Sequence, residues 1–151
     1  MNKVMILAVV AMSLAGCASG PAPTVFGNFV KGTAPADGRT MADDVAKKLT
    51  ALYPPAQTRI NLQQVTPDAF GTTLVVALRT KGYALAEFKK GPIAGAANQA
   101  GEIALAYVVD QPMEAGLYRV TVFINSQSLS RLYQAAKDGA ISPAGSWVWK
   151  E

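Results

Sequence analysis

Apolar residues recur with a helical period in two segments of the chain. The stripe that starts at Met41 continues at three- to four-residue spacing and predicts an amphipathic helix over residues 41–52. Thr40, followed three residues later by Asp43, resembles a capping box at its start. The two prolines at 54–55 would end this helix because proline cannot continue it.

The second helical pattern follows residue 66. Thr66 is expected to be the N-cap, with Pro67 at the first helical position. The predicted buried face consists of Phe70, Leu74, Val75 and Leu78. Gly82 is expected to end the helix in a left-handed conformation, which glycine adopts without steric cost.

Alternating apolar and polar residues predict strands before and after the second helix, at residues 57–65 and 83–88. If both strands share one sheet, the crossover between them is expected to be right-handed. A loop rich in Gly and Ala follows at 91–101. Further strands and turns are expected at 103–109, 117–125, 128–135, 139–145 (a turn) and 146–150.

These elements predict an α+β fold in a single small domain over residues 39–151. A strand-helix-strand unit is preceded by a helix and followed by an antiparallel meander, with a turn at 114–116. Phe123 falls on the otherwise polar face of its strand, where it would cover a helix or a partner. Trp147 and Trp149 alternate on one side of the last strand. They form either an aromatic clasp that closes the sheet or a platform for a partner.

The first residues have the layout of a cleavable export signal. Lys3 precedes an apolar run over residues 4–14, and small residues follow. A membrane-spanning helix needs about 20 apolar residues, which this run does not reach.

The sequence Leu14-Ala15-Gly16-Cys17 resembles the lipobox of bacterial lipoproteins. The resemblance implies that a diacylglyceryl group is attached to Cys17, that residues 1–16 are removed, and that the lipid is the membrane anchor. Because Ala18 rather than Asp follows the cysteine, the class rule points to the periplasmic face of the outer membrane. Alternatively, Cys17 is an ordinary residue of a generic secretory signal or an anchor helix. As the only cysteine, it cannot form a disulfide within the chain.

Residues 17–38 are dense in Gly, Pro, Ala and Ser, which predicts a lipidated flexible tether. Two apolar pairs interrupt it, at 25–26 and at 29–30, so that Phe26 and Phe29 are candidates for partner binding. Either these pairs dock on their own domain, or they become ordered on a partner by sheet extension or by filling a groove.

Chain length and charge limit the classes of function that the sequence supports. Removing residues 1–16 leaves 135 of the 151 residues, the usual size of one domain. The net charge of +4 falls to about +3 without Lys3. The only adjacent basic pairs, at 47–48 and 89–90, are not interleaved with the aromatic residues and Gly-rich turns of a nucleic-acid surface. A nucleic-acid surface is therefore not expected.

The residues required for most catalytic chemistry are missing. The chain has no histidine, and its one cysteine is assigned to the lipid, which excludes the usual zinc, copper and haem ligands and Ser-His or Cys-His pairs. No phosphate-binding glycine motif occurs, so neither a cofactor nor a metal is expected.

Paired carboxylates at 43–44, which suit a helix start, or Asp110 with Glu114 remain formal candidates for acid/base work. The serines at 126, 128 and 130 lack a neighbouring base and are read as strand-exposed hydroxyls. We therefore predict a protein that is not an enzyme.

Several segments, in order, resemble the TrbH conjugal transfer lipoproteins. They lie at 51–58, 78–83, 105–110, 117–120, 127–131 and 143–147, and the likeness extends from about Thr40 to Glu151. The resemblance implies an outer-membrane component of the mating-pair formation apparatus, a type IV secretion system, and carries over no catalytic residue. Trp149 stands where relatives have a basic residue, which makes this edge more apolar.

The favoured hypothesis is a structural lipoprotein that binds other secretion-channel subunits, in an oligomeric assembly, through an exposed strand edge or its aromatic residues. The candidate partner-binding residues are Phe26, Phe29, Phe123, Trp147 and Trp149. The main alternative is a general envelope lipoprotein that binds peptidoglycan or a small ligand and is unrelated to conjugation. The third hypothesis is a hydrolase that uses Asp110 and Glu114.

Overall fold

The computed structural model describes residues 26–32, 34–88, 100–113 and 116–151. The signal segment and the lipobox, Leu14, Ala15, Gly16 and Cys17, lie outside these ranges. Within them, no helix combines the length and the apolar character needed to cross a bilayer.

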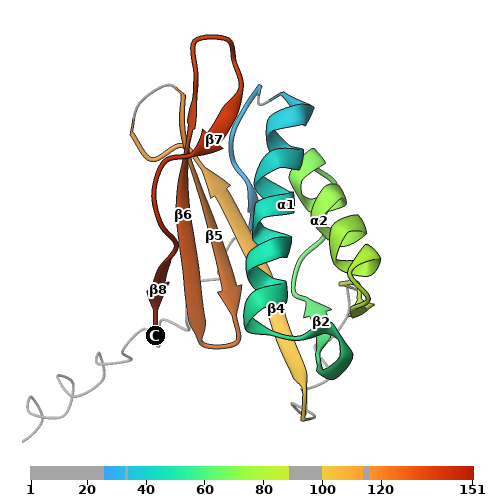
Figure 1. Cartoon of the computed structure of the whole chain (residues 1–151). Coiled ribbons are helices and arrows are strands. Elements are labelled where there is room, and N and C mark those ends of the chain that lie inside the picture. The colour runs from blue at the N-terminus through green and yellow to red at the C-terminus, as the bar shows by residue number, and fades with distance from the viewer. Residues whose placement is uncertain (1–25, 33, 89–99, 114–115) are drawn as a thin grey trace, which may run out of the picture.

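In the described residues, two helices pack side by side on one face of a mixed eight-stranded sheet (Figure 1). The helices are α1 (Pro35–Leu52) and α2 (Ala69–Thr80), with a 3-10 turn η1 (Pro55–Gln57). The strands are β1 (Gly27–Asn28), β2 (Arg59–Leu62), β3 (Ala84–Ala86), β4 (Glu102–Asp110), β5 (Leu117–Ile124), β6 (Gln127–Ala135), β7 (Ile141–Pro143) and β8 (Val148–Lys150). The predicted single α+β domain is confirmed.

The order of strands is β3-β2-β4-β5-β6-β7, with β1 beside β4 and β8 beside β6. β2 and β3 are parallel neighbours joined through α2, as the strand-helix-strand prediction required. Both strands are shorter than predicted. β2 is shorter because η1 occupies the start of its predicted range and Gln64 leaves the ladder. The side chain of Gln64 instead accepts a 2.8 Å hydrogen bond from the backbone N–H of Tyr107.

The antiparallel meander β4-β5-β6 is also confirmed. The predicted turn at 139–145 is wrong in part, because β7 lies within it and pairs with the end of β6. This pairing places Ile141 opposite Ala135 and buries the Ile141 side chain. The last strand covers Val148–Lys150 rather than 146–150.

The predicted start of the first helix is wrong. Helix α1 begins at Pro35, whose fixed φ suits a first helical position, and its N-cap is Ala34. Thr40 is already inside the helix, where its hydroxyl donates a 3.2 Å hydrogen bond to the carbonyl of Ala36. The first turns of α1 therefore occupy part of the range that was expected to be tether.

Strand β1 also falls within that range. It pairs in parallel with β4, and the N–H of Phe29 donates a 2.8 Å hydrogen bond to the carbonyl of Val109. The ring of Phe26 packs against Phe123, with a centroid distance of 5.3 Å. Thus Phe26 docks on its own domain, and Phe123 covers this N-terminal segment rather than a helix. Residue 25 lies outside the described ranges.

The second helix is capped by Asp68 and not by Thr66. The Asp68 carboxylate accepts a 3.1 Å hydrogen bond from the N–H of Gly71 and satisfies one free donor of the first turn. Gly82 has φ of +92°, which confirms the predicted left-handed stop.

The core lies between the helices and the sheet. Phe70 from α2 and Tyr107 from β4 are fully buried and meet edge to face at 4.8 Å. Each such side chain contributes about 1.5–3 kcal/mol through removal from water. Met41, Val45 and Leu49 bury the predicted stripe of α1 on the same core.

Candidate partner-binding surface

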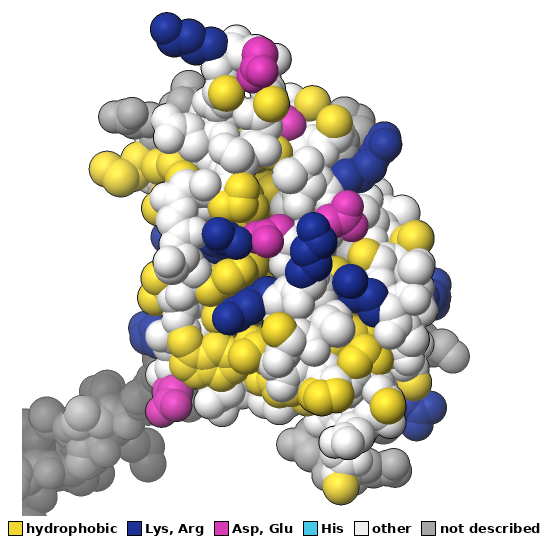
Figure 2. Space-filling view, in the orientation of Figure 1, with side chains coloured by type: hydrophobic (Ala, Val, Ile, Leu, Met, Phe, Trp, Pro, Cys, Tyr) yellow, Lys and Arg dark blue, Asp and Glu magenta, His cyan; other side chains and the backbone are white. Residues whose placement is uncertain are grey.

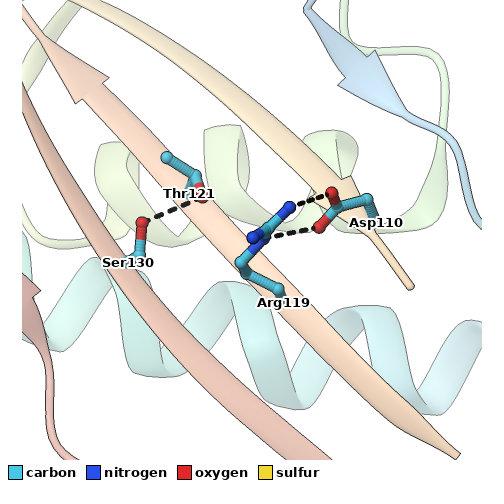
Figure 3. Close-up of polar contacts among 4 residues, drawn as sticks. All are labelled: Asp110, Arg119, Thr121 and Ser130. Atoms are coloured by element: carbon cyan, nitrogen blue, oxygen red, sulfur yellow. Dashed lines mark hydrogen bonds and ion pairs between the residues drawn. The ribbon is translucent and has the colours of Figure 1, made fainter. Parts of the chain in front are cut away.

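The sheet has one face under the helices and one face without them. Val120 and Val122 of β5 are fully buried in the core under the helices, so the alternating residues Arg119 and Thr121 point to the opposite face. Figure 3 shows their side chains in front of the strands, with both helices behind. We call this the open face, because no described helix covers it.

The strand registers arrange the open face in rows. One row contains Asp110, Arg119 and Leu132, and the next contains Val108, Thr121, Ser130 and Val148. A third row contains Ala106, Phe123, Ser128 and Lys150. Polar side chains from β4, β5 and β6 therefore lie at the centre of the first two rows, and these rows end on the side of β8 in the apolar Leu132 and Val148.

Asp110 and Arg119 form a bidentate ion pair across β4 and β5 (Figure 3). The Nε–Oδ1 distance is 3.0 Å and the Nη2–Oδ2 distance is 2.5 Å. The hydrogen bonds to Asp110 raise the pKa of the Arg119 guanidinium. Since both carboxylate oxygens are engaged, Asp110 fits a positioning role better than acid/base chemistry. Its proposed companion, Glu114, lies outside the described residues.

Thr121 and Ser130 face each other in the next row, with 2.9 Å between their hydroxyl oxygens. Ser128 lies on the same face one pair further along β6, and Ser126 is in the preceding turn. The chain has no histidine to activate these hydroxyls. The interpretation as strand hydroxyls is correct for Ser128 and Ser130 and wrong for Ser126, which lies in the turn before β6.

A groove opens between β6 and the segment that leads into β8. Its volume is about 500 Å³, and it is lined by Arg119, Ser130, Arg131, Leu132, Gly145, Ser146 and Val148. Val148 is 64% exposed and Leu132 is 38% exposed. We call this the β6–β8 groove. An exposed apolar pair bordered by charged and hydroxyl groups has the composition of a protein-binding patch.

Arg131 holds the outer wall of the groove in place. Its Nε donates a 2.7 Å hydrogen bond to the carbonyl of Gly145, and its guanidinium lies 5.7 Å from the ring centroid of Trp147. Its Nη1 donates at 2.8 Å to Asp44 of α1, which also accepts a 2.7 Å hydrogen bond from Tyr133. The segment before β8 is therefore tied to α1 through one side chain.

This contact corrects the role given to the carboxylates at 43–44. Because α1 begins at Pro35, these residues lie in the middle of the helix, and Asp44 serves β6 instead of the helix terminus. On the side of the molecule shown in Figure 2, basic and acidic side chains are interspersed, with hydrophobic side chains between them. This face is therefore not uniformly basic, unlike a typical nucleic-acid footprint.

The five aromatic candidates do not form one patch. Phe26 and Phe123 cover each other, whereas Phe29 is 53% exposed beside the end of β4. The Trp147 side chain is half-buried beside Arg131. Trp149 pairs in register with Leu129, and this register places Trp149 on the face of the sheet that the helices cover. Neither tryptophan ring pairs with another aromatic ring among the described residues.

The sequence pattern did not identify Leu132 and Val148 as candidate partner-binding residues. The signal was present, since Leu132 falls on the same alternation as Ser128 and Ser130. Recognising Leu132 and Val148 as neighbours required the pairing of β6 with β8, which strand periodicity alone does not predict. In the described part of the chain, no three potential metal-ligating residues are grouped.

The chain matches the model of the family described as "Conjugal transfer protein TrbH" over residues 23–151. No match was found among curated proteins or among solved structures.

Proposed function

Because the chain belongs to the TrbH family of conjugal transfer proteins, we propose that it is a non-catalytic, lipid-anchored component of a conjugative type IV secretion apparatus. The acylated Cys17 attaches it to the outer membrane, and the domain lies on the periplasmic side. The lipobox and the residue Ala18 support this placement, and family membership supports the role in transfer. In this role the protein helps to assemble the channel for mating-pair formation.

The β6–β8 groove is the proposed contact with other secretion-channel subunits. The observation that carries the proposal is the exposure of Val148 and Leu132 beside a wall that Arg131 fixes to α1. A binding surface whose side chains are already held in place loses less conformational entropy when a partner docks. Lipidation raises the effective concentration of this surface for subunits in the same membrane.

The two rival functions have less support. Family membership in conjugal transfer weighs against an envelope lipoprotein that is unrelated to conjugation. The engagement of both Asp110 oxygens by Arg119 weighs against a hydrolase that uses this carboxylate.

The experiment is mild crosslinking in transfer-proficient donor cells, followed by purification of the protein and identification of the secretion-channel subunits that accompany it. Val148→Asp and Leu132→Asp place a charge in the groove, and Val76→Asp is the matched control. Val76 is 57% exposed on α2, away from the open face.

We expect the two groove variants to lose the channel subunits and the control to retain them at equal protein levels. A truncated or disrupted hot spot costs about 2 kcal/mol or more, roughly a thirtyfold loss in affinity. Retention by both groove variants would reject the groove as the contact. Absence of channel subunits from the wild-type sample would reject the role in the apparatus.

A further inference from the structure

The structure shortens the link between the lipid and the domain. Phe26 already packs against Phe123, and β1 begins at the next residue. Only nine residue steps separate Cys17 from Phe26. Since an extended chain spans at most about 3.3–3.6 Å per residue, this link reaches about 32 Å at most. A tether that ended at residue 38 would reach more than twice as far.

Two large apolar side chains are exposed a few residues beyond Phe26, toward the end of β4. Phe29 follows β1 directly and is 53% exposed, and its N–H is bonded to Val109 near the end of β4. Met113 comes three residues after the last residue of β4 and is 84% exposed. Lys31, also exposed, lies two residues after Phe29. We call Phe29, Lys31 and Met113 the β4 end.

We propose that the β4 end docks on the lipid surface, with Phe29 and Met113 at the interface and Lys31 among anionic headgroups. The inference rests on the proposed acylation of Cys17, and it goes beyond that proposal by giving the domain an orientation. Phe and other large apolar side chains of interfacial segments bury at the boundary between headgroups and acyl chains, and basic residues are attracted to anionic lipids. The short link keeps these side chains within reach of the bilayer.

This orientation leaves the β6–β8 groove available to proteins. β6 is separated from β4 by β5, so the groove lies toward the opposite edge of the sheet from β1. The domain would then contact lipid at the end of β4 and a channel subunit at the surface between β6 and β8. Such a subunit must itself lie close to the outer membrane, because the domain cannot reach across the periplasm.

The test uses the acylated full chain in vesicles of phosphatidylethanolamine and phosphatidylglycerol. A spin label is attached to Phe29→Cys or, as the matched control, to Val76→Cys on α2. Acylation occupies the thiol of Cys17, so each variant carries one reactive thiol. The accessibility of the label to oxygen is compared with its accessibility to a water-soluble nickel chelate, and acylation is checked by mass spectrometry.

We expect the label at residue 29 to be more accessible to oxygen than to the nickel chelate. The label at residue 76 should be more accessible to the nickel chelate. Phe29→Cys combined with Met113→Asp should shift the label at residue 29 toward the aqueous values. If acylated protein gives aqueous values at residue 29, docking is overturned and the proposed function stands. If mass spectrometry finds no lipid on Cys17, both are overturned. Protection from both reagents that appears only in donor envelopes would assign the β4 end to a protein.

Discussion

The hydroxyl of Tyr107 donates a 2.6 Å hydrogen bond to Oδ2 of Asp68 and thereby joins the middle of β4 to the start of α2. The other oxygen of the same carboxylate accepts from the N–H of Gly71 at 3.1 Å and from the side chain of Asn28 at 3.3 Å. One carboxylate therefore connects β1, β4 and α2. The N-terminal segment is held to the domain by this connection as well as by the pairing of β1 with β4.

Tyr107→Phe should lower the free energy of unfolding by about 1.5–3 kcal/mol, the usual range for a hydrogen bond to a charged group. The substitution removes the donor and leaves Asp68 with fewer partners in a partly buried site. Urea unfolding followed by circular dichroism measures the change. Tyr118→Phe is the control, since its hydroxyl makes no hydrogen bond among the described residues. Equal stability of Tyr107→Phe and the wild type would show that the carboxylate does not organise this region.

Gly71→Ala should destabilise the domain by about 3 kcal/mol, at the upper end for an overpacked site. A Cβ at this position would lie 2.1 Å from the hydroxyl oxygen of Tyr107 and 2.8 Å from Cβ of Thr66. In the Tyr107→Phe background the cost should fall, because the nearer atom is gone, but not to zero. A double-mutant cycle measures this coupling.

Gly145→Ala is the control for the glycine substitution, because no atom lies within 4 Å of the added Cβ. Its expected effect on stability is close to zero. Additive effects of Gly71→Ala and Tyr107→Phe would contradict the close approach of α2 to β4.

Stability should decrease in alkaline solution through Tyr107 and Tyr133. Burial raises the pKa of both phenols above the usual 10.0, and hydrogen bonds to Asp68 and Asp44, respectively, raise it further. The folded state therefore holds these protons more tightly than the unfolded state. The resulting stability is fully present below the unfolded pKa of about 10 and is lost as the pH rises above it.

Denaturant unfolding on both sides of about pH 10 measures this loss. The variants Tyr107→Phe and Tyr133→Phe should each show a weaker decline with pH than the wild type, since each lacks one of the two phenols. The same decline in all three proteins would assign the alkaline sensitivity to other groups.

Arg131→Lys should weaken the wall of the β6–β8 groove while preserving its charge. Lysine cannot donate to Gly145 and Asp44 together in the geometry of a guanidinium, and it stacks less well on Trp147. We expect a loss of about 1–2 kcal/mol in stability. Faster amide exchange in residues 144–150 should accompany it, as measured by mass spectrometry. Unchanged exchange there would show that Arg131 does not hold this segment.

Much of the fold follows from local pattern. The helical stripes, the strand-helix-strand unit and the meander follow from periodicities in the sequence. The end of α2 at Gly82 follows from the left-handed conformation that glycine adopts readily. The family resemblance was confirmed by the match over residues 23–151. These features need no knowledge of which distant segments meet.

The remainder depends on contacts between distant residues. β1 has only two residues and is stabilised by β4, about eighty positions later, so its composition resembles that of a tether. Likewise, the pairing of β6 with β8 places Val148 opposite Ser130 and on the same face as Leu132. Capping-box chemistry at Thr40 was outweighed by the position of Pro35, whose geometry starts the helix earlier.

We propose that this protein serves conjugation from a lipid anchor at Cys17. The direct measurement is mating frequency in donors that carry either the wild-type protein or a version with Cys17→Ala behind an export signal that adds no lipid. The second version should reach the periplasm at the same level but leave the membrane fraction. We predict a fall in mating frequency of about a hundredfold or more, in line with the loss of effective concentration. Wild-type mating frequency supported by the unanchored domain would show that transfer does not need a lipid anchor at Cys17.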